Sequence, residues 1–257
     1  MLRSVEELFG YMLWAKDGEI GKCKDFLFDD TRWAIRYMVA DTRKWLPGRK
    51  VLISPISLDS PVWETHRFPV KLAKEKIRQA PPLDEHAPVS RQYEIKWFDY
   101  YGWPTYWTAG GLWGAAPYPS ALYLKRLEKV IEKEADPEDP NKSHLRSTRE
   151  VQGYEVQAVD GKVGRVDDFI MDEWNWILRY LVVDTGTWGA GQKVLMAPSW
   201  VKMVDWAGFT IWLAFSREAV RKSPGYHPSE PVNREYEQRL HDHYARPLYE
   251  DDKESGT

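Results

Sequence analysis

The sequence is short of cysteine, of long apolar runs and of net charge. Its single cysteine, Cys23, excludes an intrachain disulfide and is typical of a reducing compartment. No window approaches the roughly 18 consecutive apolar residues that a membrane-spanning helix needs. The N-terminus lacks the basic region and the apolar region of a secretory signal. We therefore expect a soluble, cytoplasmic protein without a membrane span.

The charge balance and the missing motifs narrow the class of function. A net charge of −3 and a pI near 6.1 leave no excess of cations to neutralise phosphates, so we expect no nucleic-acid partner. The chain contains no glycine-rich phosphate loop, no Gly-x-Ser-x-Gly and no metalloprotease helix motif. The sequence therefore predicts a protein that is not an enzyme and that needs no cofactor.

A long internal repeat organises the chain. The block Gly10–Pro55 returns as Gly153–Pro198, 143 positions later and without insertion or deletion. The match extends from Leu2 to Pro104 in the first copy, and roughly one aligned pair in three is identical. A repeat of this length has the size of an independent domain, which indicates gene duplication rather than a solenoid.

Each copy has the sequence pattern of a small β domain. The dipeptides Asp17-Gly18 and Asp160-Gly161 each lie between two apolar runs and predict a tight hairpin turn. The following strand alternates and places every second residue on one face: Trp33, Ile35, Tyr37 and Val39. About five such strands and one short helix predict a closed or nearly closed β-barrel.

Helical segments follow each barrel. Ser90 and Asn233 are good N-caps and predict the helices Arg91–Tyr101 and Arg234–Tyr244. A further helix is predicted over Ser120–Ala135, with a linker at Asp136–Lys142 and a disordered tail after Tyr249.

The predicted class is mainly β with short helices: two small β-barrels related by internal duplication, each with a helical C-terminal extension. The predicted domains are a first barrel at 1–80, a helical and Trp-rich extension with linker at 81–144, a second barrel at 145–223, and an extension with tail at 224–257.

The repeated motifs resemble those of the PRC-barrel family, named after the cytoplasmic domain of the photosynthetic reaction centre H subunit. They are the Gly-Tyr start, Asp-Gly-x-x-Gly, Asp-Phe, the strand Trp-x-Ile/Leu-Arg-Tyr-x-Val-x-Asp-Thr and the closing Val-Leu-Ile/Met-x-Pro. The resemblance covers roughly residues 1–80 and 145–223. It implies a small β-barrel that serves as an assembly or docking module, and it supplies no catalytic residues.

The resemblance leads to a functional expectation with one alternative. We expect a non-catalytic scaffold that binds another protein, with a peripheral contact at the cytoplasmic face of a membrane left open. A homo-oligomer, or an intrachain pseudo-dimer of the two barrels, is left open as well. The alternative is a sensor that binds a small ligand or a metal between the barrels. The sequence does not name the partner.

Two arginines are the candidate anchors on a strand. Arg36 and Arg179 lie mid-strand in apolar surroundings, where an arginine could hold a carboxylate or phosphate of a ligand. The structural alternative is a buried ion pair, with Asp25 and Asp168 as the expected partners.

The Trp-rich segment Gly102–Pro119 is the candidate interaction surface. An exposed cluster of large aromatic side chains would mark an interface. The alternative is packing within the chain or in a homodimer. The residues concerned are Trp103, Tyr106, Trp107, Trp113 and Tyr118.

Other recurring polar residues favour structural roles. Four aspartates recur in both copies and could form acid–base pairs or a Ca²⁺ site, but their turn contexts favour capping of turns. His241 and His243 could bind a metal, but residues two apart on a helix point in different directions. Cys23 is expected to be a buried hydrophobe. The aspartates are Asp17, Asp25, Asp29 and Asp41 with Asp160, Asp168, Asp172 and Asp184.

Overall fold

The computed structural model describes residues 1–42, 45–123, 144–186 and 191–249. Most of the predicted helix Ser120–Ala135, the predicted linker Asp136–Lys142 and the tail after Tyr249 lie outside the described residues. Only a short 3₁₀ helix, Pro119–Leu122, is described at the start of the predicted helix. No helix in the described part of the chain is long and apolar enough to cross a membrane.

The fold is mainly β, as predicted, with two mixed sheets and five short α-helices among the described residues. The six-stranded sheet has the order β5-β4-β3-β2-β6, and β7 pairs with β3. Its strands are β2 Met12–Ala15, β3 Gly18–Asp29, β4 Ala34–Asp41, β5 Val51–Ile53, β6 Arg67–Pro69 and β7 Leu145–Ser147.

The eight-stranded sheet has the order β12-β13-β8-β9-β10-β11-β14, and β1 pairs with β9. Its strands are β1 Leu2–Ser4, β8 Glu155–Ala158, β9 Gly161–Asp172, β10 Leu178–Asp184, β11 Lys193–Met196, β12 Val201–Asp205, β13 Thr210–Leu213 and β14 Gly225–Tyr226.

Neither sheet closes into a barrel among the described residues, because each strand path has two ends. The six-stranded path ends at β5 and β6, each of three residues. Just beyond β6, Val70 N donates to the carbonyl of Trp14 at 2.8 Å, and Val70 forms an isolated bridge with Leu58. The closed barrel that the strand pattern predicts is therefore not seen, and the coarser mainly-β class is what the structure shows.

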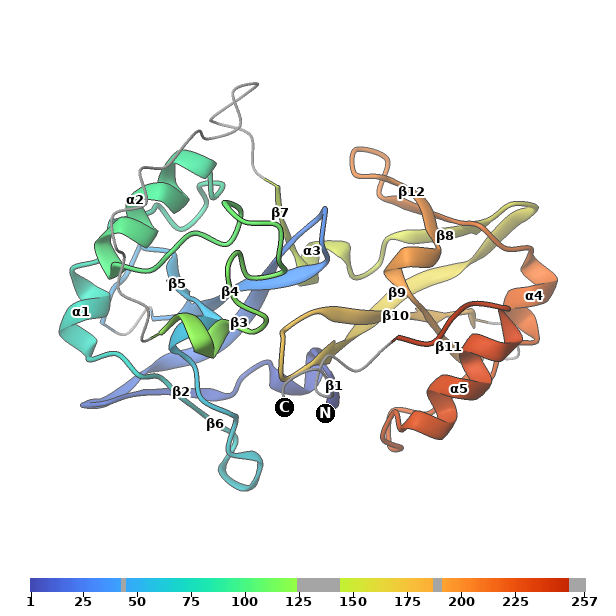
Figure 1. The fold of residues 1–257 in the computed structure, drawn as a ribbon, viewed down its shortest axis with the longest axis horizontal. Coiled ribbons are helices and arrows are strands. Elements are labelled where there is room, and N and C mark those ends of the chain that lie inside the picture. Colours follow the sequence, from blue (N-terminus) through green and yellow to red (C-terminus); the bar gives the residue numbers. More distant parts are fainter. Residues whose placement is uncertain (43–44, 124–143, 187–190, 250–257) are drawn as a thin grey trace. The chain divides into compact units, whose positions relative to one another are not determined.

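The chain folds into two compact units, and the repeats exchange strands between them (Figure 1). Unit 1 comprises Met1, Val5–Glu150 and Met171–Leu178, and unit 2 comprises Leu2–Ser4, Val151–Ile170 and Arg179–Thr257. In Figure 1 the yellow-green strand β7 lies among the blue and green elements of unit 1. Strand β7 opens the second repeat in sequence yet pairs with β3, while β1 opens the first repeat and pairs with β9.

Matched side-chain contacts hold the exchanged strands. In unit 1, Ser147 Oγ donates to Asp25 Oδ2 at 2.5 Å, and Thr148 Oγ1 donates to Asp25 Oδ1 at 3.0 Å. In unit 2, Ser4 Oγ donates to Asp168 Oδ2 at the same 2.5 Å. Two of the recurrent aspartates therefore receive the exchanged strands, one in each unit.

The predicted strand at Trp33 begins one residue later, and both of its faces are buried. Trp33 has a φ of 54° and closes the turn after Asp29, so it is not part of β4. Every residue of β4 except Asp41 is buried, because the second face is covered as well. Alternation along a strand assigns faces but cannot show that both faces are covered.

The two extension helices are confirmed. Helix α2 spans Arg91–Tyr101 and α5 spans Arg234–His243. The Ser90 side chain accepts from Tyr93 N, and the Asn233 side chain accepts from Tyr236 N, as their N-cap chemistry predicts. The remaining helices are α1 Lys74–Arg78, α3 Thr148–Val151 and α4 Arg217–Arg221.

Candidate functional site

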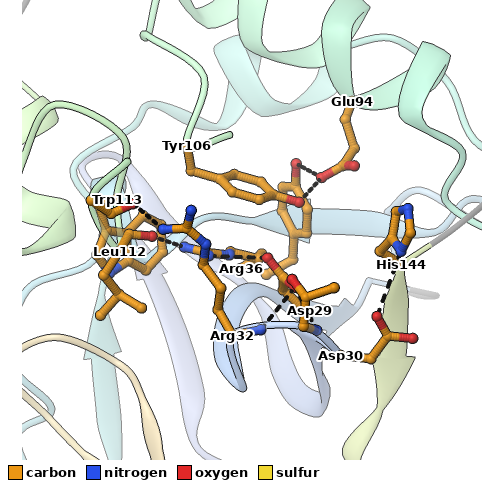
Figure 2. A network of polar contacts seen from close by, with 12 residues as sticks. Asp29, Asp30, Arg32, Arg36, Glu94, Tyr106, Leu112, Trp113 and His144 are labelled. Carbon is orange, nitrogen blue, oxygen red and sulfur yellow. Dashed lines mark hydrogen bonds and ion pairs between the residues drawn. The ribbon is translucent and has the colours of Figure 1, made fainter. Parts of the chain in front are cut away.

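A buried network of charged and aromatic side chains lies between strand β4 and helix α2 in unit 1 (Figure 2). We call it the Arg36 network. Strand β4 contributes Arg36 and Tyr37, and helix α2 contributes Arg91 and Glu94. Asp29 is the last residue of strand β3, and Tyr106 lies in the Trp-rich segment. Its members are Asp29, Arg36, Tyr37, Arg91, Glu94 and Tyr106.

A local irregularity of the sheet explains why two consecutive residues of β4 join one network. Leu27 pairs with Tyr37 and Phe28 pairs with Ile35, so Arg36 is an extra residue on β4. An extra residue bends the strand and re-aims its side chain, whereas regular alternation would point Arg36 and Tyr37 to opposite faces.

Arg36 is fully buried and closely surrounded. Its Nη2 donates to Asp29 Oδ2 at 3.1 Å, and its Nη1 donates to the carbonyl of Leu112 at 2.7 Å. The guanidinium carbon lies 3.9 Å from the ring centroid of Tyr106 and 4.8 Å from that of Trp113. The guanidinium is therefore hydrogen-bonded to a carboxylate and a carbonyl and lies close to two aromatic rings, which suits a structural arginine.

The expected partner of Arg36 was wrong. The ion pair joins Arg36 to Asp29, whereas Asp25 receives the exchanged strand β7. Burial, the largest single effect, would raise the pKa of Asp29, but the charge of Arg36 together with the hydrogen bonds from Thr31 and Arg36 lowers it. The carboxylate is therefore ionised at neutral pH and balances the buried guanidinium.

Glu94 is the second buried carboxylate of the network. It accepts from the hydroxyls of Tyr37 at 2.9 Å and Tyr106 at 2.8 Å, and Arg91 Nη1 lies 2.9 Å from its other oxygen. Burial raises the pKa of Glu94 despite these partners. Burial also raises the pKa of both tyrosines well above the ordinary value, so the tyrosines stay protonated as donors.

Unit 2 contains a related network with one different member. The hydroxyl of Tyr180 donates to Glu237 Oε1 at 2.8 Å, and the Arg179 guanidinium lies 4.5 Å from the Tyr249 ring. These residues occupy the positions of Tyr37, Glu94, Arg36 and Tyr106 in the repeat. Where unit 1 has Phe98, unit 2 has the buried His241, whose Nε2 lies 3.0 Å from the Tyr180 hydroxyl.

The Trp-rich segment packs against its own unit. Trp103, Tyr106 and Trp113 are buried, and Trp113 Nε1 donates to the carbonyl of Asn175 at 2.7 Å. The two remaining predicted surface residues are partly exposed. Trp107 stacks edge-on against Phe98, and Tyr118 packs on Trp174 with centroids 5.0 Å apart. The burial of these three side chains agrees with the alternative of packing within the chain. It leaves little exposed aromatic surface on the Trp-rich segment.

The other candidate residues have structural contacts. Asp17 Oδ1 accepts from Lys74 N, and Asp160 Oδ1 accepts from Arg217 N, so both aspartates cap short helices. Cys23 is buried, and burial raises the pKa of its thiol. No group of three or more His, Cys, Asp or Glu in the described part of the chain is placed to hold a metal.

The two histidines of the HDH triplet contact different carbonyls. His241 Nδ1 lies 2.7 Å from the oxygen of Pro247, and His243 Nε2 lies 2.7 Å from that of Ala219. Since the rings serve separate partners, they do not converge on one point.

A shallow cleft recurs at equivalent positions in both units. The cleft of unit 1 has a volume of about 420 Å³ and that of unit 2 about 430 Å³. Gly21 and Gly164 line them, and a Cβ at either glycine would lie 2.0 Å from the carbonyl oxygen of Asp41 or Asp184. Each cleft is also lined by a basic residue at the same position of the repeat, Lys74 in unit 1 and Arg217 in unit 2.

Sequence reasoning did not single out Glu94 and Glu237, and it did not bring Tyr37, Tyr106 or Tyr180 to them. The signal was present, because Glu94 and Glu237 are identical residues at equivalent positions of the two extension helices. Tyr106 and Tyr249 also correspond, two residues beyond the end of the match recognised at Pro104.

No family model matches the chain, and no curated protein matches it either.

Proposed function

We propose that this protein is a non-catalytic docking protein built on two barrels of the PRC type, acting in a complex at the cytoplasmic face of a membrane. The repeated motifs support the barrel type, and the mainly antiparallel pairing of the strands is compatible with it. The docking surface must lie where the two copies differ, since their shared residues serve the fold.

The hairpin β12–β13 of unit 2 carries the proposal. Met203 and Trp212 are directly paired across its two strands, and their side chains are 54% and 38% exposed. Phe209, at the turn, is 57% exposed. The corresponding residues of unit 1 are the smaller or more polar Ser60, His66 and Pro69. Exposed large apolar side chains grouped on one hairpin mark an interaction site.

The position of β12 defines the kind of partner. Strand β12 is the end of the sheet order, and no described strand pairs with its outer edge. An extended peptide can add to such an edge through main-chain hydrogen bonds, with apolar side chains of the peptide against Met203 and Trp212. The proposed partner is therefore a protein with an extended apolar segment.

Photo-crosslinking tests this surface. A photoreactive amino acid at position 203 is expected to capture one partner, and the same probe at the corresponding position 60 is expected to capture none. Met203→Asp with Trp212→Asp should abolish capture from a probe at position 202, because a charge would then lie in an apolar contact. The control Trp14→Asp changes an exposed tryptophan of unit 1 and should leave capture intact. Equal capture from positions 203 and 60 would contradict the proposal.

The recurring cleft favours small-ligand sensing as the second candidate function. The cleft is preserved in both units together with its glycine and its basic residue. Replacing Lys74 and Arg217 by glutamine should then abolish ligand response without altering capture at position 203. The two candidate functions are thus tested by different residues, Lys74 and Arg217 for the clefts and Met203 and Trp212 for the hairpin of unit 2.

A further inference from the structure

A cavity of about 290 Å³ lies in unit 1, and both repeats line it. The first repeat contributes Phe68 and Lys71, and the second contributes Trp174 and Trp176. Its volume is near the lower end of the range for ligand pockets, about 300 Å³. We infer that it binds a small ligand that carries a quaternary ammonium group. The cavity shares no residue with the hairpin β12–β13 or with the two recurring clefts, so this inference is independent of both candidate functions.

Aromatic rings form one part of the lining. Trp176 is 6% exposed and packs against Phe26 and Phe68, with ring centroids 6.2 Å away in each case. Trp174 is partly exposed, and its ring packs on Tyr118 with centroids 5.0 Å apart. Neighbouring rings therefore hold both indoles in place. Among aromatic side chains tryptophan attracts a cation best, because the face of its ring carries the negative part of the quadrupole.

The charged groups at the cavity favour a cation as well. The charged side chains of the lining are those of Asp59, Lys71 and Glu173. Lys71 Nζ lies 3.0 Å from Asp59 Oδ1, so these two charges offset each other. The amino group of Met1, which also lines the cavity, lies 3.8 Å from Asp172 Oδ1. With Asp172 included, three carboxylates stand against two amino groups, and this excess of negative charge attracts a cation.

The apolar part of the wall selects a quaternary ammonium over a primary one. Pro55, Pro61 and Pro119 line the cavity together with Leu8 and Leu58. Proline has no backbone N–H, and these side chains offer carbon atoms rather than hydrogen-bond acceptors. A primary ammonium has three donors that would lose their water here, which costs free energy unless acceptors replace it. A quaternary ammonium has no donor, and its methyl groups pack against apolar walls and aromatic faces.

Comparison of the repeats shows that the fold does not need these side chains. Trp174 N donates to Asp172 Oδ1 at 3.0 Å. In the equivalent turn of the first repeat, Thr31 N donates to Asp29 Oδ1 at 2.9 Å. The same turn therefore forms with threonine in place of tryptophan. Two charged residues of the lining also differ between the repeats: Lys71 corresponds to Ala214, and Asp59 corresponds to Lys202.

Isothermal titration calorimetry on the full chain tests the site. Choline is expected to bind saturably, and its uncharged isostere 3,3-dimethylbutanol is expected to bind about tenfold or more weakly, because it has the same shape but no charge. Glycine betaine carries the same ammonium group together with a carboxylate, so its affinity relative to choline distinguishes a zwitterionic from a cationic ligand. Absence of binding by both ammonium compounds, or equal binding of the isostere, would overturn the inference.

The variant Trp174→Thr copies the first repeat and is expected to weaken choline binding about tenfold or more, because it removes one of the two indoles. The matched control is Trp14→Gln, which replaces an exposed tryptophan of unit 1 by the residue of the second repeat, Gln157. This control should bind choline as the unchanged chain does. Unaltered choline binding by a folded Trp174→Thr variant would contradict the assignment of the cavity.

An NMR titration of the unchanged chain decides the matter if Trp174→Thr misfolds. The indole N–H signal of Trp174 is expected to shift as choline is added, whereas the signal of Trp14 should stay in place. A titration that moves neither signal, or moves both equally, would refute the site. Photo-capture from position 203 should continue in a folded Trp174→Thr variant, so loss of the ammonium site can be told apart from failure of the docking function.

Discussion

Replacing Arg36 by alanine is expected to lower the stability of unit 1 by about 3–5 kcal/mol, the usual cost of removing one partner of a buried ion pair. The substitution leaves the buried carboxylate of Asp29 without its counter-charge and the carbonyl of Leu112 without a donor. It also removes the group on which Tyr106 and Trp113 stack. Denaturant unfolding followed by tryptophan fluorescence measures the loss, since Trp113 reports on this site.

Arg78→Ala is the matched control for that measurement. Arg78 belongs to an exposed ion pair with Glu75 on helix α1, and such pairs contribute little to stability. Its removal should leave the unfolding midpoint unchanged. If Arg36→Ala were equally mild, the arginine would be a ligand anchor rather than a structural group, and the structural assignment of the Arg36 network would be abandoned.

Cutting the chain between the repeats is expected to leave its two halves bound to each other. With a protease site placed between residues 136 and 142, β7 stays on the second fragment yet pairs with β3 of the first. Strand β1 stays on the first fragment and pairs with β9 of the second. The fragments should co-elute in gel filtration at micromolar concentration and separate only in denaturant.

Each fragment expressed alone is expected to be largely unfolded or aggregated. The first would expose the edge of β3 and leave Asp25 without Ser147 and Thr148. A version with Arg3→Pro and Arg146→Pro provides the control, because proline in the exchanged strands removes a ladder donor and should allow separation. Ready separation of the unmodified halves would show that the exchange does not hold the chain together.

Several features could be predicted from sequence because they depend on neighbouring residues. The caps at Ser90 and Asn233 need only a side-chain oxygen and an N–H three residues on. The first hairpin turn was predicted one residue too late, at Asp17-Gly18. Its two loop residues are Lys16 and Asp17, because Gly18 already belongs to β3 and pairs with Ala15. Propensity locates such a turn, but the cross-strand register decides its boundaries.

The partner of Arg36 could not be predicted because it depends on an extra residue in β4. Arg36 is the extra residue between the Leu27–Tyr37 and Phe28–Ile35 pairs, and its guanidinium donates to Asp29 rather than to the expected Asp25. The burial of Trp113 follows from contacts with distant segments, Asn175 among them. Composition shows that aromatic residues are abundant, but it does not show which of them are buried by other segments.

By itself the sequence determined the duplication, the mainly-β class and the extension helices, because identity between copies, alternation and capping can be read along the chain. Only the tertiary structure decided that β1 and β7 change places between the units. Both strands carry the same Leu-Arg-Ser sequence, so the strand sequence by itself does not distinguish the two sites. When two copies contain the same strand sequence, local interactions do not determine which sheet each strand joins. The pairing is determined by the fold of the whole chain.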